Sequence, residues 1–162
     1  LINAYDNSSR YTDVFLAQVI DTVASFRIPA AVFYCSDHGE DLLDDARKRF
    51  LHASPVPTYY QIHIPYMWWF SPQYEALWSD EVSAVRDHRT LPVSTRNVFY
   101  TFLDVAGIDT PYAADSLAVS SGKFIPQKRY YVNDHNQPIA LDSLGLRDQD
   151  VEMMKKHGVS YP

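Results

Sequence analysis

The sequence contains a single cysteine and five glycines among 162 residues, and no long hydrophobic run. With Cys35 alone, no disulfide can form within the chain, so cysteine usage leaves the cellular compartment open. The longest near-continuous apolar run, IPYMWWF at residues 64–70, is far shorter than the roughly 20 residues that a transmembrane helix needs. No segment of this sequence is therefore expected to cross a membrane.

An excess of positive charge is also missing. The net charge of −6 argues against a broad phosphate-binding surface, so nucleic acid is not an expected partner. No phosphate-cradling glycine loop and no Gly-x-Ser-x-Gly turn is present. The hydrophobic fraction of 46% and the charged fraction of 21% are typical of a globular domain with its own core.

The periodicity of apolar residues predicts short helices alternating with strands. Asn7 or Ser8 is expected to cap the first helix, and the RKR run at residues 47–49 is expected to face solvent on the second. Such alternation predicts an α/β fold with a mostly parallel sheet and helices on both faces. Helices are predicted at residues 11–27, 42–51, 73–86, 94–106 and 148–157, and strands at residues 30–34, 62–71, 129–132 and 139–141, the last two as a hairpin.

The stretch SDHGE at residues 36–40 follows the first predicted strand. Ligands of α/β sheets bind beyond the carboxyl ends of the strands, which is where this stretch lies. A carboxylate and an imidazole form part of a zinc ligand set, so Asp37 and His38 are candidate metal ligands, and Gly39 would permit a sharp turn. The alternative is that Ser36 and Asp37 cap the next helix and that His38 is an exposed loop residue.

Several motifs in order point to one family. NAYDNS at residues 3–8, YTD at 11–13, SDHGE, LH at 51–52 and QIHIP at 61–65 together resemble the phosphoethanolamine transferases. These are membrane-anchored members of the sulfatase and alkaline-phosphatase superfamily. The resemblance covers residues 3–71, extends to the predicted helix at 93–108, and fades beyond about Ser116.

The resemblance implies a set of site residues. Asp37 and His38 would bind zinc, or another divalent metal, beside a threonine nucleophile in sequence that precedes Leu1. His52 would contact the phosphoryl or head group of the substrate, or a further zinc. Glu40 would either steady a metal-bound histidine or cap the following helix, whereas a structural role is favoured for His63.

The resemblance also implies the fold and the function. Residues 1–162 would form the C-terminal portion of one sulfatase-like catalytic domain, part of an alkaline-phosphatase-like α/β/α sandwich, and would be inactive alone. The intact protein would be anchored upstream in a bacterial inner membrane, and its domain would face the periplasm. It would transfer phosphoethanolamine to a lipid or glycan through a covalent threonine intermediate.

Two alternative functions and one further expectation accompany this hypothesis. One alternative is a sulfatase or phosphatase-type ester hydrolase of the same superfamily, because the metal motif is common to both. Another is a non-catalytic fold fragment or a binding domain. Self-association through an exposed sheet edge is expected if part of the sheet lies outside this chain.

Overall fold

The computed structural model describes residues 2–52, 56–133 and 135–161. Its helices and strands are short apart from the first helix. The α-helices are α1 (Ile2–Ser25), α2 (Tyr59–Ile62), α3 (Pro72–Leu77), α4 (Ser79–Asp87), α5 (Arg96–Val105) and α6 (Asp148–Lys156), the 3-10 helices are η1 (His88–Thr90), η2 (Asp115–Leu117) and η3 (Leu141–Ser143), and the strands are β1 (Ala31–Cys35), β2 (Asp41–Leu42), β3 (Phe50–Leu51), β4 (Tyr66–Phe70), β5 (Tyr130–Val132) and β6 (Pro138–Ala140).

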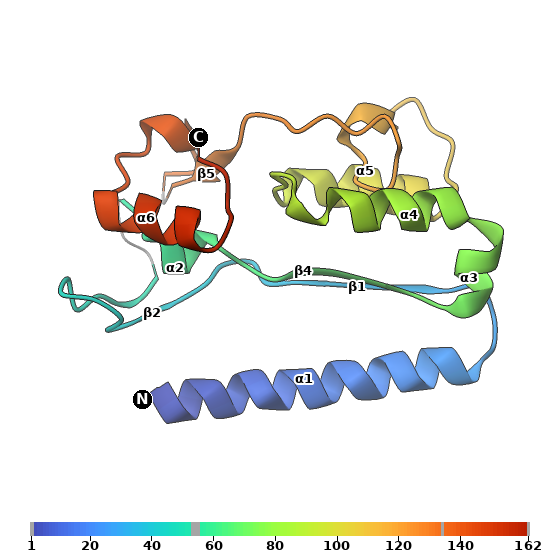
Figure 1. Ribbon diagram of the computed structural model, residues 1–162, viewed down its shortest axis with the longest axis horizontal. Helices are drawn as coiled ribbons and strands as arrows, with labels where there is room; N and C mark the ends of the chain where they lie inside the picture. Colours follow the sequence, from blue (N-terminus) through green and yellow to red (C-terminus); the bar gives the residue numbers. More distant parts are fainter. Residues whose placement is uncertain (1, 53–55, 134, 162) are drawn as a thin grey trace.

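The central layer is the strand pair β1–β4, which carries helices on both of its faces. Helix α1 runs along one face, and α4 and α5 cover the other (Figure 1). This arrangement supports the predicted α/β class with a helix–sheet–helix layering. Among the described residues, no helix is both long enough and apolar enough to span a bilayer.

The predicted mostly parallel sheet is not confirmed. The strand pairs that the structure describes, β1–β4, β2–β3 and β5–β6, are all antiparallel. A parallel neighbour needs a long crossover, usually a helix, to bring the chain back to the same end of the sheet. Between β1 and β4 the chain instead turns through β2, β3 and the four-residue α2, so β4 starts at the end where β1 stops.

The first helix begins earlier than predicted. Helix α1 starts at Ile2, so Asn7 and Ser8 lie inside it, and the prediction that one of them caps the helix is wrong. The Ser8 hydroxyl donates to the carbonyl oxygen of Tyr5 at 2.7 Å. Serine in a helix can bond to the preceding turn in this way, and its presence does not by itself mark the first residue of a helix.

The helix predicted at residues 42–51 is wrong as well. The segment is a hairpin of β2 and β3, and Leu43, Lys48 and Leu51 have φ values of 67°, 49° and 64°, outside the right-handed helical region. Two acidic side chains compete with helical bonding. Asp44 Oδ2 accepts from the Leu42 N–H at 2.6 Å, and Asp45 Oδ1 accepts from the Arg47 N–H at 2.8 Å.

The remaining elements follow the predictions more closely. Strand β1, the β5–β6 hairpin and helix α6 lie within one residue of their predicted bounds at every end, and the predicted second strand is shortened to β4 by α2. The helix predicted at residues 73–86 is divided into α3 and α4 at Trp78. Helix α5 ends before Gly107, whose φ of +62° suits the helix stop expected there.

An aromatic core joins the sheet to the helices of one face. The Phe33 ring of β1 lies 4.7 Å from Trp68 of β4 and 5.3 Å from Phe102 of α5, and Phe70 stacks at 5.1 Å on Tyr74 of α3. Antiparallel pairing places Phe33 directly opposite Trp68, so the same face of the strand pair carries both rings. Tyr74 is buried in this cluster, whereas the residues of β4 are part-exposed.

Helix α6 is tied to the β2–β3 hairpin by a buried ionic cluster. Arg47 donates to Asp150 through Nη1 at 2.7 Å and Nη2 at 2.8 Å, and through Nε to Asp45 at 2.9 and 3.0 Å. The Asp150 side chain is 1% exposed and also accepts from the Tyr59 N–H at 2.9 Å. Arg47 is therefore a part-buried tether between segments 103 residues apart, and the expectation that it faces solvent is wrong.

We expect Asp150→Asn to lower the free energy of unfolding by about 3 kcal/mol, because it leaves a partly buried guanidinium with one carboxylate fewer. Denaturant unfolding of the two proteins measures the difference. Glu75→Gln is the matched control, because it breaks the exposed Arg86–Glu75 pair, which contributes less than about 1 kcal/mol. Equal losses in the two variants would contradict the tether.

The same cluster predicts a stability loss in acid. Hydrogen bonds from Arg47 lower the pKa of Asp45 from 3.8 to about 2. A depressed folded-state pKa contributes stability that is fully present above 3.8 and is lost as the pH falls toward about 2. Thermal unfolding between pH 5 and pH 2 should therefore show a steep decline that Arg47→Gln makes shallower. Lys123→Gln, which breaks an exposed pair with Asp115, should leave the slope nearly unchanged.

Candidate metal centre

The site lies where the chain leaves β1. Ser36 Oγ donates to the His38 carbonyl oxygen at 2.6 Å, and the His38 N–H donates to Asp37 Oδ1 at 3.0 Å. These local bonds fold the stretch after the strand into a compact turn. The hydrogen bond from the His38 N–H lowers the pKa of Asp37.

Gly39 is required by a close approach of two backbone segments. Its N–H donates to the Gln61 carbonyl oxygen at 2.9 Å, and a Cβ at this position would lie 2.0 Å from the Tyr60 carbonyl oxygen. Gly39 is not among the glycines with positive φ, so its contribution is space and not the special dihedral angle that a sharp turn suggests. It lets α2 pack directly against the turn that carries His38.

The register of the β2–β3 hairpin brings Glu40 and His52 together. Asp41 pairs with Leu51, and the residues just outside that pair are Glu40 and His52, which would face each other in an extended ladder. Hydrogen bonds to the buried Asp41 carboxylate hold this pairing in place. The carboxylate accepts hydrogen bonds from Thr58 Oγ1 at 2.8 Å and from Gln61 Nε2.

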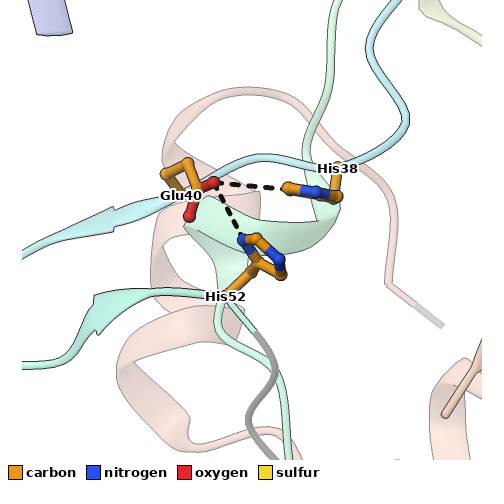
Figure 2. A group of neighbouring side chains, drawn as sticks. All are labelled: His38, Glu40 and His52. Atoms are coloured by element: carbon orange, nitrogen blue, oxygen red, sulfur yellow. Dashed lines mark hydrogen bonds and ion pairs between the residues drawn. The ribbon is translucent and has the colours of Figure 1, made fainter. Parts of the chain in front are cut away.

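The side chains of His38, Glu40 and His52 converge on one point. His52 Nδ1 donates to Glu40 Oε1 at 2.9 Å, His38 Nδ1 lies 3.7 Å from the same oxygen, and the two imidazole centroids are 3.8 Å apart (Figure 2). One ligand atom from each residue lies within 4.8 Å of the others. Two imidazoles and a carboxylate at such spacing form a donor set of the kind that binds zinc.

One oxygen of Glu40 supports a metal at this point. Glu40 Oε2 is buried and has no hydrogen-bond partner among the described residues. A buried carboxylate oxygen without a partner costs free energy, which a bound cation would offset. The three residues therefore fit a divalent metal ion, and such an ion would replace the proton on His52 Nδ1.

Asp37 stands apart from this group. Its side chain is 87% exposed, and its Oδ2 lies 3.7 Å from His38 Nε2, the nitrogen on the other side of the ring from Glu40. Asp37 and Glu40 thus approach His38 through different nitrogens. The predicted ligand pair of Asp37 and His38 is close in space, and Glu40 with His52 forms a second set around the same imidazole.

Other candidate residues have structural partners. The Tyr59 hydroxyl lies 2.6 Å from His63 Nδ1, and burial, assisted by the charge of His157, lowers the pKa of His63. These contacts favour the structural role expected for His63. The sequence pattern predicts only a supporting or capping role for Glu40. The register of the β2–β3 hairpin would have indicated a direct role. Glu40 immediately precedes the paired residue Asp41, and His52 immediately follows its partner Leu51.

Comparison with known proteins places this site within a matched region. A family model described as Sulfatase matches residues 1–108, which include β1, the hairpin and all residues of the candidate centre. The chain belongs to the sulfatase family. The residues beyond 108, including α6 and its tether to Arg47, lie outside the matched region.

Curated relatives of this sulfatase-family chain are phosphoethanolamine transferases. Phosphoethanolamine transferase EptA of Salmonella typhimurium is 32% identical over 124 residues, which cover 72% of this chain and 22% of that protein. The Kdo(2)-lipid A phosphoethanolamine 7''-transferase of Escherichia coli K12 is 40% identical over 76 residues, covering 46% of this chain and 13% of that protein. The chain thus spans about a fifth or less of the length of these relatives.

Solved structures share the fold. The C-terminal periplasmic domain of EptC from Escherichia coli superimposes with a TM-score of 0.73 at 25% identity, covering 87% of this chain and 40% of that domain. A complex of that domain with Zn superimposes with a TM-score of 0.66 at 24% identity, covering 90% of this chain and 41% of that one. The likeness to the second structure shows the common fold alone.

We expect Gly39→Ala to destabilise the protein by about 1 to 3 kcal/mol, because the added methyl group overlaps the Tyr60 carbonyl oxygen. Displacement of α2 should also weaken metal binding, so calorimetric metal titration and thermal unfolding both test it. Gly122→Ala is the matched control, since a Cβ there meets nothing within 4 Å. A Gly39→Ala protein as stable as the control would disprove the close approach.

Proposed function

We propose that this chain is the C-terminal part of the catalytic domain of a metal-dependent phosphoethanolamine transferase. The domain faces the periplasm of a bacterium and acts on a lipid or glycan. The observation that carries the proposal is the convergence of His38, Glu40 and His52 after β1, within the region that the sulfatase family model matches. The similarity to phosphoethanolamine transferases over most of the chain favours transfer over ester hydrolysis.

The ligands that this chain contributes are His38, Glu40 and His52, with Asp37 on the far side of His38. Imidazole nitrogen and carboxylate oxygen favour zinc among the common divalent ions. A bound zinc ion would stabilise negative charge on a transferring phosphoryl group and lower the pKa of a coordinated nucleophile. The ring centroids of His38 and His52 are 3.8 Å apart and their planes are inclined at 37°, so both imidazoles lie side by side at the site.

The nucleophile belongs to the part of the protein outside this chain. The relatives are several times longer, and the solved EptC domain is more than twice as long as the portion matched here. We infer that a threonine from that remainder forms the covalent intermediate, as the family resemblance implies.

Helix α1 offers a surface on which the remainder of the protein can pack. Helix α1 has no buried residue, and its Tyr11, Val14 and Phe15 are half or more exposed. We also expect self-association through the open outer edges of the β1–β4 pair.

A first experiment tests the metal centre. We expect Glu40→Gln in the intact protein to reduce zinc affinity by about 10- to 100-fold, because the amide lacks the charge of the carboxylate and its NH₂ group cannot ligate. Competition with a zinc-binding dye measures the affinity. Glu152→Gln, on the exposed face of α6, is the control and should bind zinc as the wild type does. Unchanged affinity in Glu40→Gln would remove this residue from the centre.

A second experiment tests the reaction. Membrane-reconstituted intact protein should move phosphoethanolamine from phosphatidylethanolamine to lipid A, detected by mass spectrometry of the acceptor, and His52→Asn should slow this transfer about 100-fold or more. Release of free phosphoethanolamine without a modified acceptor would instead identify a hydrolase. A protein that binds no zinc and performs neither reaction would support a non-catalytic binding domain.

A further inference from the structure

A cavity of about 520 Å³ opens beside the candidate metal centre, between the N-terminal half of α1 and the turn after β1. His38 and Glu40 form part of its wall, so a ligand in the cavity would reach the metal centre directly. The α1 helix passes beneath the end of β1 and the β2 hairpin (Figure 1), which is how residues near the N-terminus come to face the site.

The wall of this cavity is rich in aromatic rings. Four tyrosines line it, from three different elements or their edges: Tyr5, Tyr34, Tyr59 and Tyr60. The Tyr59 and Tyr60 rings meet edge to face at 5.6 Å. Aromatic faces attract a cation placed within about 6 Å of a ring, and tyrosine cages bind substituted ammonium groups in this way.

The charges around the cavity also favour a cation. Asp44 lines it with a carboxylate that the metal centre does not use, beside the imidazoles of His38 and His63, and none of its described lining residues is lysine or arginine. The Asp44 carboxylate is held at the wall by the hydrogen bond that Oδ2 accepts from the Leu42 N–H at 2.6 Å. The nearest guanidinium that acts on Tyr60, that of Arg47, is engaged by Asp45 and Asp150.

The ionisation of Tyr60 is consistent with this field. Burial raises the pKa of Tyr60, and the carboxylates of Asp44 and Asp45 raise it further, outweighing the opposing effect of Arg47. The burial contribution disfavours a charge of either sign, whereas the carboxylates of Asp44 and Asp45 attract a positive charge at this place. An anionic phosphate would meet the opposite balance here, and its place is the metal centre next to the cavity.

We propose that this cavity binds the ammonium group of the phosphoethanolamine donor, with the Tyr60 ring and the Asp44 carboxylate as its main contacts. The assignment rests on the proposed transferase function. It divides the donor head group between two adjoining places: the phosphoryl group at His38, Glu40 and His52, and the amine in the tyrosine-lined cavity. The cavity thereby selects ethanolamine over neutral head groups of similar size.

The test compares two donors in vesicles with the intact protein. One is phosphatidylethanolamine, and the other is an analogue in which a hydroxyl group replaces the ammonium group. We expect wild type to prefer the charged donor in kcat/KM, and we expect Tyr60→Leu and Asp44→Asn each to raise KM for it by about tenfold and to lose the preference. Tyr60→Phe, which keeps the ring, should retain most of the preference. Tyr112→Leu, on an exposed side chain away from the cavity, is the matched control.

The outcomes separate this inference from the function on which it rests. If wild type transfers neither head group, the proposed function fails. If wild type transfers phosphoethanolamine and the Tyr60 and Asp44 variants keep the full preference for the charged donor, the transferase stands and the ammonium site is overturned. A rise in KM for the acceptor alone overturns it as well. If a variant is unstable, the wild type is titrated with ethanolammonium chloride and with ethylene glycol, and the tyrosine NMR resonances are followed. Perturbation by the ammonium compound alone supports the site. Equal responses to the two compounds refute it.

Discussion

The antiparallel pairing of Asp41 with Leu51 is the constraint on which the candidate centre depends. It is a very short ladder, and a two-residue strand pair contributes little stability by itself. Its register nevertheless decides which side chains meet, because a shift by one residue would turn Glu40 and His52 to opposite sides. Hydrogen bonds from Thr58 and Gln61 to the buried Asp41 carboxylate hold the register from the side of α2.

Buried charge supplies the rigidity that this small hairpin lacks. Asp150 places one carboxylate against both the Arg47 guanidinium and the Tyr59 N–H, so the hairpin tip, α2 and α6 are joined at a single group. Replacing such a cluster with apolar residues can leave a protein equally stable, but its directional bonds specify one arrangement. Here that arrangement keeps the tip of the hairpin fixed while its open ends, at Glu40 and His52, remain at the site.

The sequence predicted the apolar strand β1, the tryptophan strand and α5 with its glycine stop, because periodicity carries that information. His52 was assigned to the same site as Asp37 and His38 only by the family resemblance. The sequence did not predict the hairpin at residues 42–51. There the apolar spacing is helical, and side-chain-to-backbone bonds from Asp44 and Asp45 override it. Neither the contact between Arg47 and Asp150 nor the role of Gly39 could be predicted, since both depend on segments that meet only in the folded chain.

The imidazole of His38 couples the two possible ligand sets. Its Nδ1 lies 3.1 Å from the Gly39 carbonyl oxygen as well as 3.7 Å from Glu40, and its Nε2 faces Asp37. A proton on Nδ1 would be donated to Gly39, which leaves the Nε2 lone pair for an ion shared with Asp37. In the other neutral tautomer the proton is on Nε2, and the Nδ1 lone pair is available to the ligand set of Glu40 and His52. Because Gly39 is fixed by its own bond to Gln61, the packing of α2 takes part in deciding which nitrogen of His38 is the ligand.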